Sequence, residues 1–249
     1  MEKQGQALAD RPRMIVAAEM LSGGLGIVTA RAGDSGVACP KSAEAYQPLQ
    51  MSHAKTIVLD TLDNPYDFQS YVITYAATTI MKVAYEKDTP TLATDPEVRE
   101  VHQSFDRFRK VLHPGAYLVN LIPWLKYLPW YGKELKRGFE SKRRLHTSQL
   151  NRVKLQISNT DVVPSFAKFA LENGHSYGIA ELEAVFLAGT FFGAGSATTS
   201  VAICTVLMAA ACFPEEQAKV QDELDAVIGM RRGIDSPFAS QFMKNDLLW

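Results

Sequence analysis

A cluster of glycine and hydroxyl residues lies at the centre of a segment, residues 184–214, that contains no charged side chain. The cluster begins at Gly193 and reads GAGSATTS. Inside a helix each glycine costs about 1 kcal/mol relative to alanine, and hydroxyls compete for backbone carbonyls. Thr190, Ala194 and Thr198 recur at intervals of four, which places them on one stripe of a helix. This stripe would let a flat cofactor approach the helix closely.

Two other interpretations of the charge-free segment stay open. A run of more than about 18 apolar residues is typical of a membrane-spanning helix, and the pattern from Gly189 to Gly193 is a small-residue spacing by which helices pair in lipid. The flanks lack the Lys/Arg excess that sets membrane orientation, because Glu181 and Glu183 precede the segment and two glutamates follow it. The other interpretation is a buried central helix of a large helical domain. We expect a buried helix and not a span.

A second helix is predicted directly after this segment. It begins at Pro214, which fits the first turn of a helix, continues with two acids near the positive end of the helix dipole, and closes on Gly229. Together, residues 194–200 and 214–229 resemble the long distal helix and the following helix of the haem-thiolate monooxygenases, the cytochrome P-450 family. The likeness is greatest to fungal members.

Motifs upstream extend the resemblance. ADRP at 9–12 resembles the segment before the family's haem-contacting helices, residues 71–85 resemble a mid-domain helix, and PWLKYLP at 123–129 resembles the lead-in to the next long helix. In order and spacing the chain follows roughly the N-terminal half of the family's catalytic domain. We therefore expect residues 1–249 to form a single, incomplete, all-α cytochrome P-450 domain that lacks the C-terminal haem-ligand region.

The resemblance implies roles for the residues of the stripe and its neighbours. Ala194 and Gly195 would form a loosened turn over the haem iron and contact the cofactor. Thr198 would be the catalytic residue, hydrogen-bonded to the dioxygen on the iron. Thr190 and Gly193 would border the substrate.

The implied function is monooxygenation, with haem b as the cofactor. One oxygen atom of O2 would be inserted into an apolar small molecule of the secondary-metabolite or xenobiotic type, with electrons from an NADPH-dependent reductase. Full-length fungal members are tethered to the endoplasmic reticulum membrane by an N-terminal helix. We expect this chain to lack that anchor, so that membrane association and a cytoplasmic location both stay open.

Some of the family's chemical groups are not found where the resemblance would place them. Its iron ligand is a cysteine thiolate in a loop well downstream of the distal helix, whereas Cys39, Cys204 and Cys212 lie in other contexts, so no metal ligand is predicted. The acid that normally precedes the key threonine is replaced by Ala197; a positioned acid or base contributes about a hundred- to ten-thousand-fold in rate. Residues 23–45 are expected to be an irregular segment rich in Gly, Ala and Ser. Within it, residues 23–40 lack the set of Trp and Arg residues with which the family holds a haem propionate.

A second function class therefore stays open: a non-catalytic helical remnant without haem, with an interaction role or none. The five histidines show no metal-ligand spacing, and the three cysteines do not form a disulfide pattern. A net charge of -1 argues against nucleic acid as a partner, because such binding needs a strongly basic surface.

The remaining elements are predicted from helical periodicity and turn residues. Asp95 is the expected N-cap of a helix that has Pro96 at its first position and is ended by Pro114 and Gly115. Its apolar face consists of Val98, Val101, Phe105, Phe108 and Leu112. Residues 131–159 form a further helix whose basic residues face solvent, and the aromatic connector 123–131 is expected to pack into the core more readily than to contact a membrane. Residues 230–249 are expected to be a disordered or altered tail.

Overall fold

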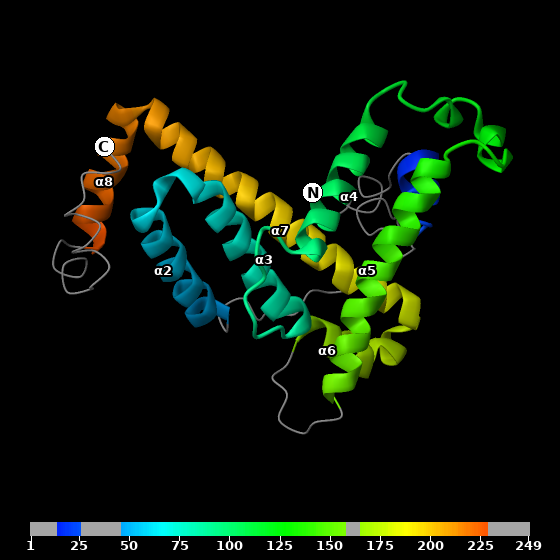
Figure 1. Cartoon of the computed structure of the whole chain (residues 1–249), viewed down its shortest axis with the longest axis horizontal. Coiled ribbons are helices and arrows are strands. Elements are labelled where there is room, and N and C mark those ends of the chain that lie inside the picture. Colours follow the sequence, from blue (N-terminus) through cyan, green and yellow to red (C-terminus); the bar gives the residue numbers. More distant parts are fainter. Residues whose placement is uncertain (1–13, 26–45, 158–164, 229–249) are drawn as a thin grey trace, which may run out of the picture.

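The computed structural model of the chain describes residues 14–25, 46–157 and 165–228. Within these ranges the regular structure is helical and contains no strand, which confirms the all-α fold class (Figure 1). The α-helices of the described ranges are α2 (Gln47–Asp63), α3 (Phe68–Tyr85), α4 (Pro96–Leu112), α5 (Lys133–Ile157), α6 (Phe166–Asn173), α7 (Glu181–Cys212) and α8 (Pro214–Ile228). The predicted tail, and the predicted irregular segment beyond residue 25, lie outside the described residues.

Helix α7 organises the molecule. It crosses the structure diagonally in Figure 1, contacts α4, α5 and α6, and packs most extensively against α3. Its start is fixed by Glu183, whose Oε2 accepts a 2.7 Å hydrogen bond from the backbone N–H of Ala180, as in the second half of a capping box. An ion pair between Glu181 and Lys154 ties the same turn to α5. The charge-free segment is thus one continuous helix with an acidic start.

The two halves of α7 have different surroundings. Side chains from Ala184 to Ser200 include all the buried residues of the helix, whereas those from Val201 onward are exposed or partly exposed. By length and composition α7 is the one helix of the described ranges that could cross a membrane, and only 17% of its qualifying 18-residue window is buried. The expectation of a buried helix is therefore correct for the first half of α7. It is wrong for the second half, where no side chain is buried by the described residues.

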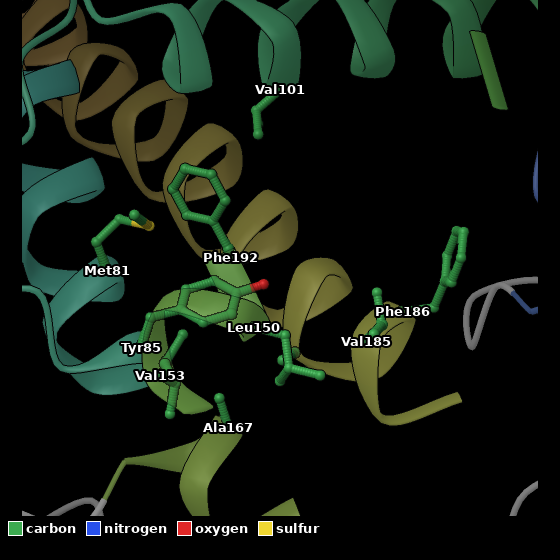
Figure 2. Close-up of a cluster of buried hydrophobic side chains, with 11 residues drawn as sticks. Met81, Tyr85, Val101, Leu150, Val153, Ala167, Val185, Phe186 and Phe192 are labelled. Carbon is green, nitrogen blue, oxygen red and sulfur yellow. The ribbon is translucent and has the colours of Figure 1, made fainter. Parts of the chain in front are cut away.

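The larger hydrophobic core surrounds the first half of α7. Tyr85 of α3 and Phe192 of α7 meet edge to face, with ring centroids 6.4 Å apart, and both are fully buried. Figure 2 shows Val101 of α4 on one side of this pair, with Leu150 of α5 on the other. Aromatic pairs of this geometry contribute about 0.5–1.5 kcal/mol beyond their buried area. Helices α3, α4 and α5 are thereby fixed around one stretch of α7.

A second, smaller core lies at the other side of α5. The π-helical turn Ile15–Met20 packs against Val111 at the end of α4, Val119 in the connector and Leu135 at the start of α5. Buried residues of this core come from segments more than a hundred positions apart in the sequence. It fixes the connector between α4 and α5 to the body of the molecule.

Helix α4 begins at Pro96 as predicted, with Asp95 at the N-cap position. The Asp95 side chain does not cap the helix, however, because its Oδ2 accepts a 3.0 Å hydrogen bond from the N–H of Leu92. The predicted apolar face is only partly buried: Val98 is buried, whereas Phe105 is 43% exposed. The helical spacing of apolar residues correctly predicted the helix. It overstated how much of the apolar face of α4 the neighbouring helices bury.

Two further expectations are not fully confirmed. The basic residues of α5 face solvent only in part. Lys133, Lys136 and Arg137 are exposed as predicted, whereas Lys142, Arg152 and Lys154 are partly buried. The aromatic connector does not pack into the core as expected, because Trp124 and Tyr127 are among the most exposed large side chains of the described residues. The inward contacts of the connector are made by other residues instead.

Candidate functional site

The predicted stripe on α7 lies at the border between its buried and exposed halves. Ala194 and Thr198 are exposed, and Thr190, one turn earlier, is half-buried. The Oγ1 atom of Thr190 is itself buried and has no hydrogen-bond partner, which is uncommon for a buried hydroxyl. The structure therefore places the three residues on one line along the helix, with an unpaired hydroxyl at its inner end.

The hydroxyl of Thr198 is engaged within its own helix. Its Oγ1 donates a 2.6 Å hydrogen bond to the carbonyl oxygen of Ala194, four residues earlier. Thr205, further along α7, makes the same contact with Val201 at 2.8 Å. Such back-bonding is the ordinary behaviour of a threonine inside a helix. The contact at Thr198 is thus no sign of special chemistry by itself.

The loosened turn expected at Ala194 and Gly195 is not found, because α7 is an unbroken α-helix from Glu181 to Cys212. Packing explains Gly195: a Cβ atom there would lie 2.6 Å from the side chain of Ile80 on α3. Gly193 has no such neighbour, since a Cβ atom would meet only Val101, at 4.0 Å. Of these two glycines, only Gly193 has free space beside it that a side chain or another group could fill.

Ala197, where the family has an acid, faces the protein interior. It is 6% exposed, and Ser196 and Ser200 on the same side are equally inaccessible. Its neighbour Thr198 is exposed, so the two side chains leave the helix on different sides. A carboxylate at position 197 would enter a buried, mostly apolar environment.

One buried polar residue close to the stripe was not predicted from the sequence. His146 of α5 is 2% exposed, and neither ring nitrogen has a hydrogen-bond partner. Burial, with a smaller contribution from the charge of Lys142, lowers the pKa of this imidazole to about 3, so the ring is neutral. A signal was present in the sequence, because His146 follows Phe139 by seven residues and precedes Leu150 by four, which puts it on the apolar face of α5.

Ala194, the predicted haem contact, is small and exposed, which leaves room for a planar cofactor at that position. The cysteines of the described ranges, Cys204 and Cys212, both belong to α7 itself, and burial raises the pKa of Cys204, which opposes thiolate formation. No group of three metal-binding side chains occurs in these ranges. Within the described ranges the exposure of Ala194 is therefore compatible with the predicted cofactor contact, whereas neither cysteine is a suitable thiolate ligand.

Comparison with known proteins decides between a general helical domain and a specific family. Residues 51–244 match the model of the family described as "Cytochrome P450". The chain belongs to the cytochrome P450 family. This P450 chain is 41% identical over 239 residues to cytochrome P450 monooxygenase 113 of Postia placenta, in a match covering 92% of this chain and 48% of that relative. It is 39% identical over 255 residues to monooxygenase 88 of the same fungus, covering 99% and 50%.

A third relative, cytochrome P450 monooxygenase ARMGADRAFT_1018420 of Armillaria gallica, is 29% identical over 93% of this chain and 47% of that protein. The P450 chain spans about half the length of the curated relatives it matches. The resemblance to fungal members inferred from the sequence is confirmed. The roles assigned to the site residues stay predictions; these residues are Thr190, Gly193, Ala194, Gly195 and Thr198.

Proposed function

We propose that the protein represented by this chain is a haem-dependent monooxygenase that oxidises an apolar small molecule with O2. Electrons would come from an NADPH-dependent reductase, and the site of action would be the endoplasmic reticulum membrane. One observation carries the proposal: in a P450 chain, α7 exposes Ala194 and Thr198 on one line, beside the space left open at Gly193. When bound, the haem supplies oxygen activation and the transfer of one oxygen atom.

The chain's own residues would contribute to binding and proton handling. The Thr198 hydroxyl holds a proton at Oγ1, and rotation about its χ1 angle would redirect that proton from the Ala194 carbonyl towards the exposed face. The unpaired Oγ1 of Thr190 can accept or donate a hydrogen bond to a polar group of the substrate. Gly193 leaves room for an apolar group beside it.

The test joins residues 1–228 to the second half of the Postia placenta relative, monooxygenase 113, with residues 23–40 replaced by those of the relative. The measured quantity is the ratio of product formed to NADPH consumed. Thr198→Ala is expected to lower this ratio, because the proton donor is removed. Thr205→Ala is the matched control, since Thr205 makes the same helical contact outside the stripe.

In the same chimera Ala197→Asp is expected to give less folded protein and no gain in the ratio, because the side chain at position 197 leaves α7 on the buried side, away from Thr198. Haem occupancy and helical content are measured for every variant. An unchanged ratio in Thr198→Ala, at equal occupancy and helicity, would show that this face of α7 has no catalytic role.

The second candidate function is a non-catalytic helical protein. It is favoured by the position of Cys204 and Cys212. Both cysteines belong to α7, so neither could bind a haem from the side opposite to that helix. For the chain as it stands we expect no thiolate-type Soret band after reduction with haem and addition of carbon monoxide. Appearance of that band would exclude the non-catalytic alternative and identify a thiolate ligand within these 249 residues.

A further inference from the structure

Two polar side chains, one on α5 and one on α7, carry buried atoms that have no hydrogen-bond partner within the described ranges. Both ring nitrogens of His146 lack a partner, and so does Oγ1 of Thr190. His146 is 2% exposed, so bulk water does not reach its ring. Leaving a buried donor or acceptor unpaired is costly, and folded proteins usually satisfy such groups with ordered water or a ligand. These atoms therefore call for an occupant.

The two side chains belong to the same contact between α5 and α7. The His146 ring lies so close to Gly189 that no Cβ atom fits there, and Thr190 is the next residue of α7. The ring also meets Phe186 edge to face, with centroids 5.7 Å apart. Phe186 and Thr190 are four residues apart, so they lie on one side of the helix. The imidazole thus covers the turn of α7 that leads from Phe186 to Thr190.

Free space borders this contact. Gly193 lies one helical turn after Gly189, on the same side of α7. A Cβ atom at Gly193 would meet only Val101 of α4, at 4.0 Å. An apolar group can therefore lie beside Gly193 while a polar atom of the same molecule reaches the unpaired groups one turn earlier.

The chemistry of the pair favours an uncharged oxygen. A neutral imidazole has one donor and one acceptor nitrogen, and a threonine hydroxyl both donates and accepts. The surroundings are aromatic, because Phe139 of α5 stacks on Phe186 with ring centroids 5.5 Å apart. A charged group would lose its hydration there, which is far more costly than burying a hydroxyl or carbonyl oxygen that finds partners. Lys142 is the charged group whose field reaches the His146 ring, so a carboxylate is the alternative that a test must exclude.

We propose that His146 and Thr190 form a polar subsite that binds an uncharged hydroxyl or carbonyl oxygen of an otherwise apolar molecule. A water molecule fills the subsite in the absence of that molecule, since two or more polar partners are enough to hold a buried water. The inference rests on the proposed function and deepens it, because it narrows the substrate class to apolar molecules with one such oxygen. Thr198 lies eight residues beyond Thr190, about 12 Å along the helix. The oxidised carbon would lie about that far from the oxygen that the subsite holds.

The test uses the full 249-residue chain without haem and three probes that share one ring system. These probes are 2-naphthol, 2-methylnaphthalene and 2-naphthoate, which present an uncharged oxygen, a methyl group and a carboxylate. Isothermal titration calorimetry measures their affinities. We expect 2-naphthol to bind about fivefold or more tightly than 2-methylnaphthalene, because it gains hydrogen bonds in a buried position. We expect 2-naphthoate to bind most weakly.

Nuclear magnetic resonance of the histidine-labelled chain separates the two sources of oxygen. The chain contains five histidines, and the signal of His146 is identified by its loss in His146→Phe. Without a probe, the His146 ring protons are expected to show a contact with water. With 2-naphthol, this contact should be replaced by one with the probe.

Two variants remove the polar atoms with little change of shape. Thr190→Val and His146→Phe are each expected to weaken 2-naphthol binding about fivefold or more and to abolish its preference over 2-methylnaphthalene. Thr205→Val is the matched control, because it removes an exposed, back-bonded hydroxyl of the same helix. That control should bind all three probes as the wild type does. Circular dichroism verifies helical content, and Thr190→Val decides the outcome if His146→Phe does not fold.

Four results would overturn the proposal. Equal affinities of the wild type for 2-naphthol and 2-methylnaphthalene would remove the polar contribution. Tightest binding of 2-naphthoate would make this an anion site that uses Lys142. An unchanged affinity of Thr190→Val for 2-naphthol would place the probe elsewhere, and a His146 ring that contacts neither water nor probe would show a closed core.

Failure of the subsite and failure of the proposed reaction are distinguishable. The binding measurements involve neither haem nor catalysis, so a negative result leaves the role of Thr198 untouched. An unchanged product ratio in the Thr198→Ala chimera would conversely reject the reaction and leave the oxygen-binding subsite in place.

Discussion

The imidazole ring of His146 occupies the space that a side chain at Gly189 would need. A Cβ atom at position 189 would lie 2.2 Å from the Cγ atom of His146. The same ring meets Phe186 edge to face, with centroids 5.7 Å apart. Helices α5 and α7 therefore approach each other through a histidine on one helix and a glycine on the other, one residue before Thr190.

Replacement of Gly189 by alanine is expected to destabilise the chain by about 1–3 kcal/mol. Its methyl group would overlap the His146 ring, which is buried and has little room to move. Gly193→Ala is the matched control, because a methyl group there meets only Val101 at 4.0 Å. That control should be neutral or stabilising by up to about 1 kcal/mol, through higher helix propensity. Urea unfolding measures both, and equal destabilisation would contradict the close contact.

Acid is expected to destabilise the chain through His146. The pKa of the imidazole is about 3 in the folded chain and 6.5 for an unperturbed group, so between these values the unfolded chain binds the extra proton. The free energy of unfolding should be unaffected by this group above pH 6.5. It should then fall by about 1.4 kcal/mol per pH unit as the pH decreases towards 3.

Urea unfolding as a function of pH would measure this contribution. His146→Leu should remove that part of the pH dependence, whereas His175→Gln, at an exposed position, should keep it. A wild-type curve with the same slope as the His146→Leu curve between pH 6 and 4 would show that the imidazole is not buried in solution.

Restoring the family's acid at position 197 is expected to lower stability. Ala197 is 6% exposed, so Ala197→Asp would bury a carboxylate and cost about 2–4 kcal/mol at neutral pH. Thr198→Asp places the same group on the exposed side and should cost under about 1 kcal/mol. Thermal unfolding of the two variants gives the comparison. A smaller effect at 197 than at 198 would mean that the orientation of this turn is wrong.

Helix α7 is expected not to span a membrane, although it is long and apolar enough to do so. Its first half is buried against α3, α4, α5 and α6, and those contacts would be lost in a lipid-spanning orientation. Glycosylation acceptor sites placed before Glu181 and after Pro214 in a translocation assay should not be separated by the membrane. Modification of only one of the two sites in most molecules would contradict the helical packing described above.

Helix positions followed from local residues wherever proline or glycine marks a boundary. Helices α4 and α8 begin at Pro96 and Pro214 as expected. Helix α5 begins at Lys133, two residues after the predicted start, because Gly132 adopts a positive φ of 64° before it. The unequal burial of α7 could not be predicted, since a uniformly apolar helix has no polar face from which to infer its neighbours.

The candidate site was predictable in its residues and not in its contacts. The interval of four correctly placed Thr190, Ala194 and Thr198 on one line. Gly195 was attributed to a nearby cofactor, but the structure explains it by Ile80, a residue of a helix distant in the sequence. Such a requirement arises only when two helices come together, so a single sequence gives no sign of it.

The division of α7 into a covered and an uncovered half has a consequence for backbone dynamics. Amide hydrogens before Ser200 lie in the part of α7 that the core encloses, whereas those after it lie in the part whose side chains are exposed or partly exposed. Deuterium uptake is governed by such local opening. We expect slow exchange up to Ser200 and rapid exchange beyond it, so that the boundary between two cooperative unfolding units lies inside the longest helix and not at a loop.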